Sequence, residues 1–209
     1  MKRKQIPLLV TFEGVDGCGK STHVGLAYRF LTDRGYTVTC LREPGSTTVA
    51  EQIRQILLDR RSQITPVTEL LLYEAARAEI TARKILPLLK RGEIVLCDRY
   101  YDSTTAYQGY GRRLDLKSIR LLNRVAAGEL RPDLTLLFEV DLKTAFARRG
   151  KNLDRLESES KSFYRRVRAG FHQIAQKERG RVKVIDSSRP VEVVFEDVAR
   201  YLLRKLSHR

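Results

Sequence analysis

The chain has 209 residues, of which 42% are hydrophobic and 31% are charged. This composition excludes a disordered protein, and no apolar run approaches the roughly eighteen residues that a membrane span requires. Lysine and arginine (40) outnumber aspartate and glutamate (25), and the resulting net charge of +15 indicates an anionic partner: nucleic acid, a membrane surface or a phosphorylated small molecule.

Short apolar runs alternate with helical patterns along the chain. The runs expected to form strands are 7–13, 37–41, 93–97, 134–140 and 182–186. The helical patterns cover 20–34, 48–59, 65–90, 116–129, 142–149, 157–178 and 191–206. Strands that are apolar on both faces and separated by helices are typical of a parallel sheet covered on both sides. No linker or repeat interrupts the pattern, so we predict a single α/β domain over residues 1–209 with a five-stranded parallel sheet.

The basic start of the chain and its cysteines bear on its cellular location. The apolar run after residues 1–7 stops at Glu13, which is too short for the hydrophobic region of a signal peptide. Cys18, Cys40 and Cys97 cannot form a fully paired disulfide framework, and their spacing is not that of metal ligands. We therefore expect reduced thiols in a cytoplasmic protein.

The first predicted strand ends in a phosphate-binding motif. Residues 14–21 fit G-x-x-x-x-G-K-[ST] and stand between a predicted strand and a predicted helix, a context that disfavours an incidental glycine-rich turn. Backbone N–H groups of such a loop surround phosphate oxygens, while Lys20 is expected to reach the β- and γ-phosphates and Ser21 to bind Mg²⁺. The predicted ATP-binding residues are Gly14, Val15, Asp16, Gly17, Cys18, Gly19, Lys20 and Ser21.

Several classes of phosphate-loop protein fit this chain poorly. A GTPase should carry a guanine-reading Asn-Lys-x-Asp segment, and the nearest string, at residues 151–154, has the wrong order. Motor and helicase ATPases use far more chain for coupling elements. A phosphate-loop domain of this size is typical of a small-molecule kinase, which holds two phosphorylated substrates. A basic nucleic-acid-binding ATPase is the alternative, although no recognition helix or stacking platform is evident.

Four further segments complete a pattern with the phosphate loop and with Phe12 and Glu13 before it. They read Arg42-Glu43-Pro44-Gly45, Tyr73-Glu74-Ala75-Ala76-Arg77, Asp98-Arg99-Tyr100 followed by Ser103-Thr104-Thr105-Ala106-Tyr107-Gln108-Gly109, and Asp154-Arg155-Leu156-Glu157. With these segments in the family's order from about residue 8 to 206, the chain resembles the thymidylate kinases. The resemblance implies a P-loop kinase fold with a short basic lid and transfer of the γ-phosphoryl group of ATP to dTMP, giving dTDP and ADP. Another pyrimidine nucleoside monophosphate kinase is the alternative.

The resemblance assigns catalytic roles around the phosphates. Asp98, at a strand end, is suited to hold Mg²⁺ through water together with Ser21, and Arg99 is expected to hold the acceptor phosphate near the γ-phosphate of ATP. The attacking phosphate oxygen is already anionic, so no strong base is needed. His23, His172 and His208 match no catalytic position.

A basic segment at about residues 148–156 is expected to form the lid. Some thymidylate kinases carry a catalytic arginine inside the phosphate loop, where this chain has Gly17. The lid must then supply that charge, as in the bacterial type, and Arg149 and Arg155 are the candidates.

For dTMP, the resemblance implies contacts from several segments. Tyr73, where phenylalanine is common, is expected to stack on thymine, and Arg77 to bond its carbonyl group. Asp16 is expected to accept a hydrogen bond from the 3′-hydroxyl and Tyr107 to crowd the 2′ position, which favours deoxyribose. The predicted dTMP-binding residues are Asp16, Arg54, Tyr73, Arg77, Arg99, Ser103, Thr104, Tyr107 and Gln108, with Thr104 and Gln108 at the base edge, Arg54 near the monophosphate and Pro44 in the pocket wall. From the residues alone, core packing for Tyr73 and a solvated charge for Arg54 stay open.

The expected partners are ATP, dTMP and Mg²⁺, with neither specific nucleic acid nor membrane, and the resemblance suggests a homodimer packed through helices. The positive charge is concentrated late in the chain: residues 141–209 hold 18 lysines and arginines against 9 aspartates and glutamates. Part of this excess is the lid. The rest lies outside every family motif, as at Arg165, Arg166, Arg168, Arg179, Arg181 and Lys183.

Overall fold

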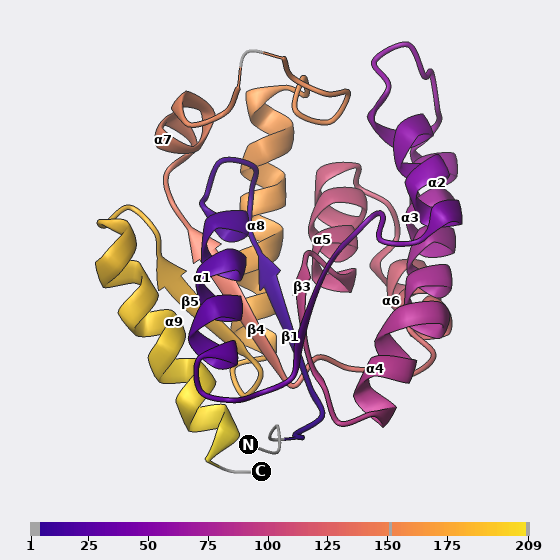
Figure 1. Ribbon diagram of the computed structural model, residues 1–209. Coiled ribbons are helices and arrows are strands. Elements are labelled where there is room, and N and C mark those ends of the chain that lie inside the picture. The colour runs from indigo at the N-terminus through magenta and orange to yellow at the C-terminus, as the bar shows by residue number, and fades with distance from the viewer. Residues whose placement is uncertain (1–4, 151, 208–209) are drawn as a thin grey trace.

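A five-stranded parallel sheet forms the centre of the computed structural model, which describes residues 5–150 and 152–207 (Figure 1). The strands are β1 (Leu8–Glu13), β2 (Val38–Arg42), β3 (Ile94–Asp98), β4 (Leu134–Glu139) and β5 (Val182–Asp186). They lie in the order β2-β3-β1-β4-β5, and each neighbouring pair is parallel. The predicted α/β class is confirmed. Because all strands are parallel, their carboxyl ends share one edge of the sheet, at the top of Figure 1.

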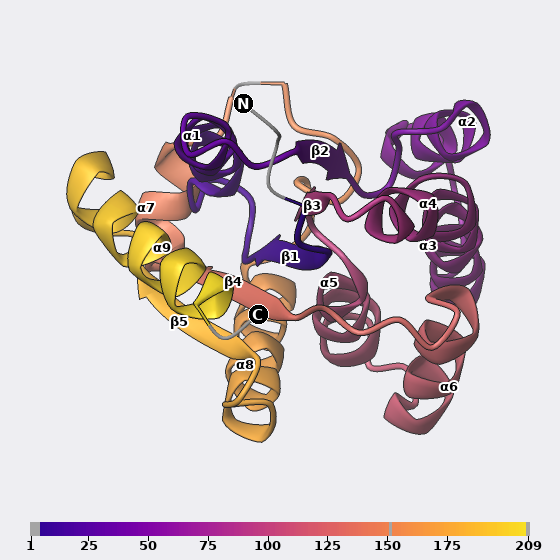
Figure 2. The same ribbon diagram turned by 60° about the horizontal axis from the view of Figure 1, so that its bottom comes forward.

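Helical segments connect the strands. They are α1 (Lys20–Thr32), α2 (Thr48–Leu58), α3 (Pro66–Ile80), the π-helical η1 (Thr81–Ile85), α4 (Leu86–Lys90), α5 (Tyr101–Thr104), the π-helical η2 (Thr105–Gly111), α6 (Leu116–Ala126), α7 (Leu142–Ala147), α8 (Lys161–Lys177) and α9 (Val191–Leu206). In Figure 2, α1 and α9 cover one face of the sheet, and α5 and α8 lie on the other. The helices α2, α3 and α6 pack beside one another at the side of the molecule (Figure 2).

One predicted helix begins later than its sequence pattern indicates. The pattern starts at residue 157, but α8 starts at Lys161, where the hydroxyl of Ser160 accepts a hydrogen bond from the Phe163 N–H (3.2 Å). The preceding residues form a turn, in which the Glu157 N–H donates to the Asp154 carboxylate (2.8 Å). A capping serine is a strong helix start, and here it leaves the turn available to the lid.

The central strand β1 is buried along its whole length, and this places its end deep in the molecule. Leu8, Val10 and Phe12 belong to the larger apolar core with residues of α1, α8 and α9, whereas Leu9 packs into a second cluster with residues of η1 and β3. The alternation follows from the two-residue period of a strand. A six-residue strand covered on both faces therefore holds the following loop rigidly.

No helix within residues 5–150 and 152–207 has the length and apolar character needed to cross a membrane.

Candidate active site

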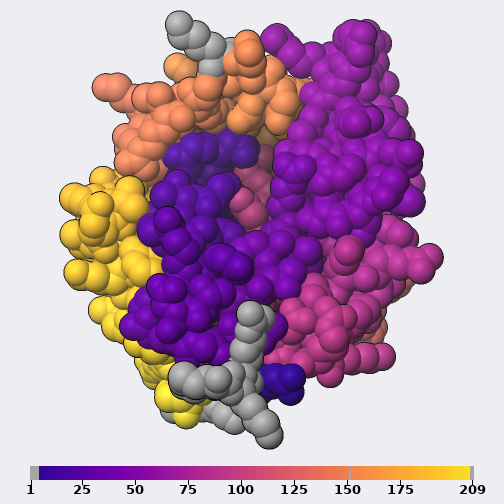
Figure 3. Space-filling model, viewed as in Figure 1, coloured from indigo at the N-terminus to yellow at the C-terminus, as the bar shows by residue number. Residues whose placement is uncertain are grey.

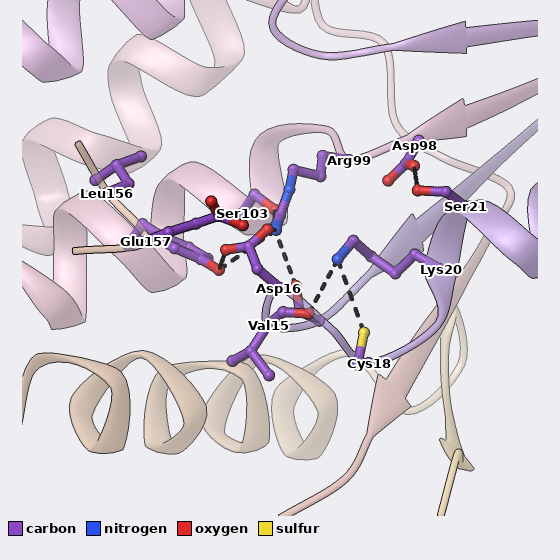
Figure 4. A network of polar contacts seen from close by, with 12 residues as sticks. Val15, Asp16, Cys18, Lys20, Ser21, Asp98, Arg99, Ser103, Leu156 and Glu157 are labelled. Atoms are coloured by element: carbon purple, nitrogen blue, oxygen red, sulfur yellow. Dashed lines mark hydrogen bonds and ion pairs between the residues drawn. The ribbon is translucent and has the colours of Figure 1, made fainter. Parts of the chain in front are cut away.

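The phosphate loop connects β1 to α1 and follows a path that requires glycine. Gly17 has φ +83°, and a Cβ there would lie 2.1 Å from the carbonyl oxygen of Ala145 in α7. Lys20 is only 6% exposed, and its Nζ donates to the carbonyl of Val15 at 3.0 Å (Figure 4). The lysine is thus folded over its own loop, at the place where phosphate oxygens would bind.

Ser21 and Asp98 meet beside this loop, as expected for a metal site. Asp98 ends β3, next to β1 in the sheet, and the Ser21 Oγ donates to its Oδ2 at 2.5 Å (Figure 4). Among the described residues no group of three or more acidic, histidine or cysteine side chains is placed to hold a metal. One hydroxyl and one carboxylate suit Mg²⁺, which keeps several waters and binds substrate phosphates as well.

Arg99 directly follows β3, and its side chain reaches the phosphate loop. Its backbone is left-handed (φ 70°), and its guanidinium donates to the Gly14 carbonyl and the Ser103 hydroxyl, both at 3.0 Å. It also forms an ion pair with Asp16 (Figure 4). Burial opposes ionisation of Asp16, but the charges of Arg99 and Lys20 hold its pKa well below the usual range. Arg99 is therefore a fixed cation at the mouth of the loop.

Tyr107 completes the surroundings of Asp16. Its hydroxyl donates to the Asp16 Oδ2 at 2.9 Å, and the Arg99 guanidinium lies 5.2 Å from its ring centroid. The two residues expected to contact the sugar are thus in direct contact with each other.

Glu13 supports this arrangement through Tyr100 and Ser103, and no sequence motif predicts a role for it. It is fully buried, and its two carboxyl oxygens contact the Tyr100 N–H (2.7 Å) and the Ser103 hydroxyl (2.5 Å). Burial, with the nearby charge of Asp102, raises the pKa of Glu13 to about 8. The signal in the sequence is an acidic residue at the end of a mostly apolar strand.

A single cavity brings together all nine residues predicted to bind dTMP. In the space-filling view, a hollow opens between the phosphate loop, α2 and the lid segment (Figure 3). The residues that line the cavity are Asp16, Arg54, Tyr73, Arg77, Arg99, Ser103, Thr104, Tyr107 and Gln108, together with Glu43, Pro44, Leu58, Tyr100, Asp154 and Leu156. The cavity therefore runs from the phosphate loop, at Asp16 and Arg99, to the buried side chains of α3 and η2.

At the inner end of the cavity, Arg77 is 2% exposed and its donors are occupied by the protein. Its guanidinium contacts Glu43 through Nε and one terminal nitrogen (both 2.9 Å), and Glu74 at 2.9 Å. It also donates to the Asn123 amide oxygen (3.1 Å) and the Thr104 hydroxyl (2.9 Å). These contacts comprise four hydrogen bonds from the five N–H groups of an arginine, and an ion-pair contact with Glu43 from the terminal nitrogen that also donates to Thr104. A bond to the base would require one of them to be exchanged.

The carboxylates around Arg77 were not assigned from the sequence. Burial raises the pKa of Glu43 to about 7, although Arg77 opposes the shift. Glu43 precedes Pro44, and the peptide bond between them is cis. Arg54 donates to the carbonyl of Pro44 at 3.0 Å, so this arginine holds the cavity wall as well as lining it.

The two lid arginines have different surroundings. The Nε of Arg149 donates to the backbone carbonyl of Asp16 (3.3 Å), and its guanidinium lies 4.2 Å from the ring centroids of Phe146 and Tyr164. Arg155 instead donates to the carbonyl of Leu57 (2.8 Å) and pairs with Glu69 (2.7 Å). The structure thus brings Arg149, but not Arg155, to the phosphate loop. Lys151 of the expected lid lies outside the described residues.

Much of the late basic surface has intramolecular partners. Arg181 pairs with Asp102, Arg168 with Glu139, and Arg166 donates to the Gly111 carbonyl. These arginines connect α8 and the start of β5 to neighbouring elements. Two histidines also have intramolecular partners. His23 is buried with its Nδ1 2.9 Å from the Gly19 carbonyl, and His172 contacts Glu139. His208 lies outside the described residues.

A parallel sheet with a phosphate loop after β1 and a second pocket beside that loop is typical of a P-loop kinase that acts on a small molecule. The family model described as thymidylate kinase matches residues 12–198. The chain belongs to the thymidylate kinase family.

Individual relatives agree with this assignment. The chain is 46% identical over 191 residues to a thymidylate kinase of Chlorobaculum tepidum, covering 86% of this chain and 89% of the relative. It is 44% identical over 209 residues to one of Geobacter sulfurreducens, covering 96% and 98%. The solved structure of thymidylate kinase from Ehrlichia chaffeensis is 35% identical in sequence and superposes with a TM-score of 0.78. The match covers 94% of this chain and 98% of that structure's chain.

Proposed function

We propose that this protein transfers the γ-phosphoryl group of ATP to dTMP, giving dTDP and ADP for dTTP synthesis. The observation that carries the proposal is the single cavity lined by all nine predicted dTMP-binding residues, which ends at Arg99 beside the phosphate loop. A monophosphate bound there would point its phosphate at the position expected for the γ-phosphate of ATP, as in-line transfer requires.

The chain's own cations supply the stabilisation that this transfer needs. Lys20 would exchange its bond to the Val15 carbonyl for phosphate oxygens of ATP, and Arg99 would hold the phosphate of dTMP. Arg149, already in contact with the Asp16 carbonyl, is the better placed of the two lid candidates. Because the acceptor oxygen is anionic from the start, these groups position the reactants and neutralise charge, and none removes a proton.

We also propose that Ser21 and Asp98 hold Mg²⁺ when ATP is bound. The hydroxyl and carboxylate are adjacent and lie beside the phosphate loop. The ion would neutralise charge on the β- and γ-phosphates.

A homodimer and a cytoplasmic location complete the proposal. Pairs of exposed apolar side chains lie on the three helices at the side of the molecule: Val49 and Ile56 on α2, Val67 and Leu71 on α3, and Leu121 and Val125 on α6. Such a surface is suited to pairing with a second copy. The cysteines, Cys18, Cys40 and Cys97, are unpaired, as expected in a reducing compartment. Analytical ultracentrifugation should give twice the chain mass.

A coupled assay of ADP release tests the function. With ATP and Mg²⁺, we expect dTMP to be phosphorylated well above UMP or AMP, and dUMP less efficiently because the contact with the 5-methyl group is lost. Preference for another monophosphate, or ATP hydrolysis that needs a polynucleotide rather than dTMP, would contradict the proposal.

A further inference from the structure

Glu69 in α3 is a buried carboxylate that the phosphoryl transfer does not use. It is 1% exposed, and both of its oxygens face arginines. The Arg112 Nε and one terminal nitrogen donate to its two oxygens at 3.0 and 2.9 Å, and Arg155 from the lid segment lies 2.7 Å from its Oε2. Burial opposes ionisation, yet the hydrogen bonds from Arg112 and Gln108 and both positive charges lower the pKa of Glu69. Glu69 is therefore an ionised carboxylate inside the protein.

The remaining contact of Glu69 determines which way an amide group faces. Gln108, which is 1% exposed and lines the cavity, lies with its amide nitrogen 2.8 Å from the Glu69 Oε1. An ionised carboxylate accepts hydrogen bonds and cannot donate one, so the NH₂ of Gln108 must face it. The amide oxygen of Gln108 is then turned the other way, toward the cavity.

Thr104 is oriented in the opposite sense by a second buried ion. Its hydroxyl oxygen accepts from the Arg77 guanidinium at 2.9 Å, so its own hydrogen is left to point elsewhere. The inner end of the cavity thus combines an acceptor, the Gln108 oxygen, with a donor, the Thr104 hydroxyl.

We infer that Glu69 is a positioning residue for base selectivity: by holding the Gln108 amide in one orientation, it makes the pocket accept a base with an N–H at position 3 and reject cytosine. Thymine and uracil offer that N–H and a carbonyl oxygen beside it. Cytosine offers an acceptor at N3 and an amino group, so it mismatches at both positions. The inference rests on the proposed dTMP site, and goes beyond it in naming the group that sets its hydrogen-bond polarity.

The variant Glu69→Gln tests the inference because a neutral amide at 69 can donate as well as accept, which lets Gln108 turn over. We expect the ratio of kcat/KM for dTMP over dCMP to fall at least tenfold, chiefly through a higher KM for dTMP. The matched control is Arg112→Met, which removes two contacts of Glu69 but keeps the carboxylate, and its ratio should stay within threefold of the unmodified enzyme.

An unchanged ratio in Glu69→Gln, or an equal loss in Arg112→Met, would overturn the inference. If Glu69→Gln alone does not fold, the double variant Glu69→Gln/Arg112→Gln replaces the ion pair with two neutral amides and should show the same loss of selectivity. A failure of the proposed function is distinct, because the unmodified enzyme would then not phosphorylate dTMP at all.

Discussion

The two ends of the cavity hold their arginines in different ways. At the phosphate end, Arg99 contacts one carboxylate, a backbone carbonyl and two hydroxyls, and Arg149 contacts backbone oxygens and aromatic rings. At the base end, Arg77 lies between two buried carboxylates, and Arg112 and Arg155 share a third. Cations with few anionic partners keep positive charge available for phosphate. Cations paired with buried carboxylates fix the shape and polarity of a pocket instead.

The largest expected effect is at the phosphate end. Lys20→Ala or Arg99→Ala should lower kcat by at least about a thousandfold, because each removes charge stabilisation from the transferring phosphoryl group. Steady-state kinetics measure this, and circular dichroism with thermal unfolding checks that the fold survives. Either variant keeping the unmodified kcat would refute the role given to that residue.

Removing a cation at the base end should instead cost stability. Arg77→Met leaves the carboxyl groups of Glu43 and Glu74 buried without their cation, and breaking such a pair costs about 3–5 kcal/mol. Urea unfolding at pH 6 and pH 8 measures the loss. It should be larger at pH 8, because carboxyl groups with raised pKa values can protonate in the folded state at pH 6. An equal, small loss at both pH values would contradict the comparison.

The lid supplies one arginine to each end, which gives a direct contrast within one segment. Arg149→Gln should lower kcat about a hundredfold, because Arg149 lies at the phosphate loop. Arg155→Gln should change kcat less than fivefold and raise the KM for dTMP, because Arg155 supports Glu69. Parallel measurement of kcat and KM in both variants decides between them, and the reverse pattern would exchange the two assignments.

The last prediction concerns stability alone and lies at Glu13, which supports the segment between the two ends. Its pKa is raised to about 8 in the folded protein, so the folded state keeps a proton that the unfolded chain releases above about pH 4.5. Stability should therefore fall as pH rises from 5 to 8. Glu13→Gln should remove this slope, which a shift in pKa from 4.5 to about 8 makes worth about 3 kcal/mol over this pH range. Unfolding free energies at both pH values measure it, and parallel curves for the two proteins would argue against the buried neutral acid.

The fold and the residues of the phosphate end can be predicted from the sequence, because both depend on local patterns of residues. Residues 14–21 form a loop whose function is contained in eight consecutive positions, and Asp98-Arg99 directly follows an apolar strand. The base end is harder to predict because its contacts join distant segments. Glu69 contacts Arg112, which is 43 positions further along the chain, and Arg155, which is 86 positions further. A glutamate before Leu70-Leu71-Leu72 hints at a buried acid, but nothing local identifies its partners.

The start of α8 is a second feature that the sequence pattern does not predict correctly. The helical pattern from residue 157 is real, yet Ser160 caps the helix at its own position and the residues before it close a turn through Asp154 and Glu157. The helical pattern favours a start at residue 157 and the capping serine favours a start after Ser160, and the cap determines where the helix begins.

The close approach of Gly17 to Ala145 has a consequence for how members of this family can diverge. Any side chain at position 17 would displace α7, and with it the segment that carries Arg149, because its Cβ would overlap a backbone oxygen. A substitution at position 17 would therefore change the position of Arg149 as well as the charge of the loop.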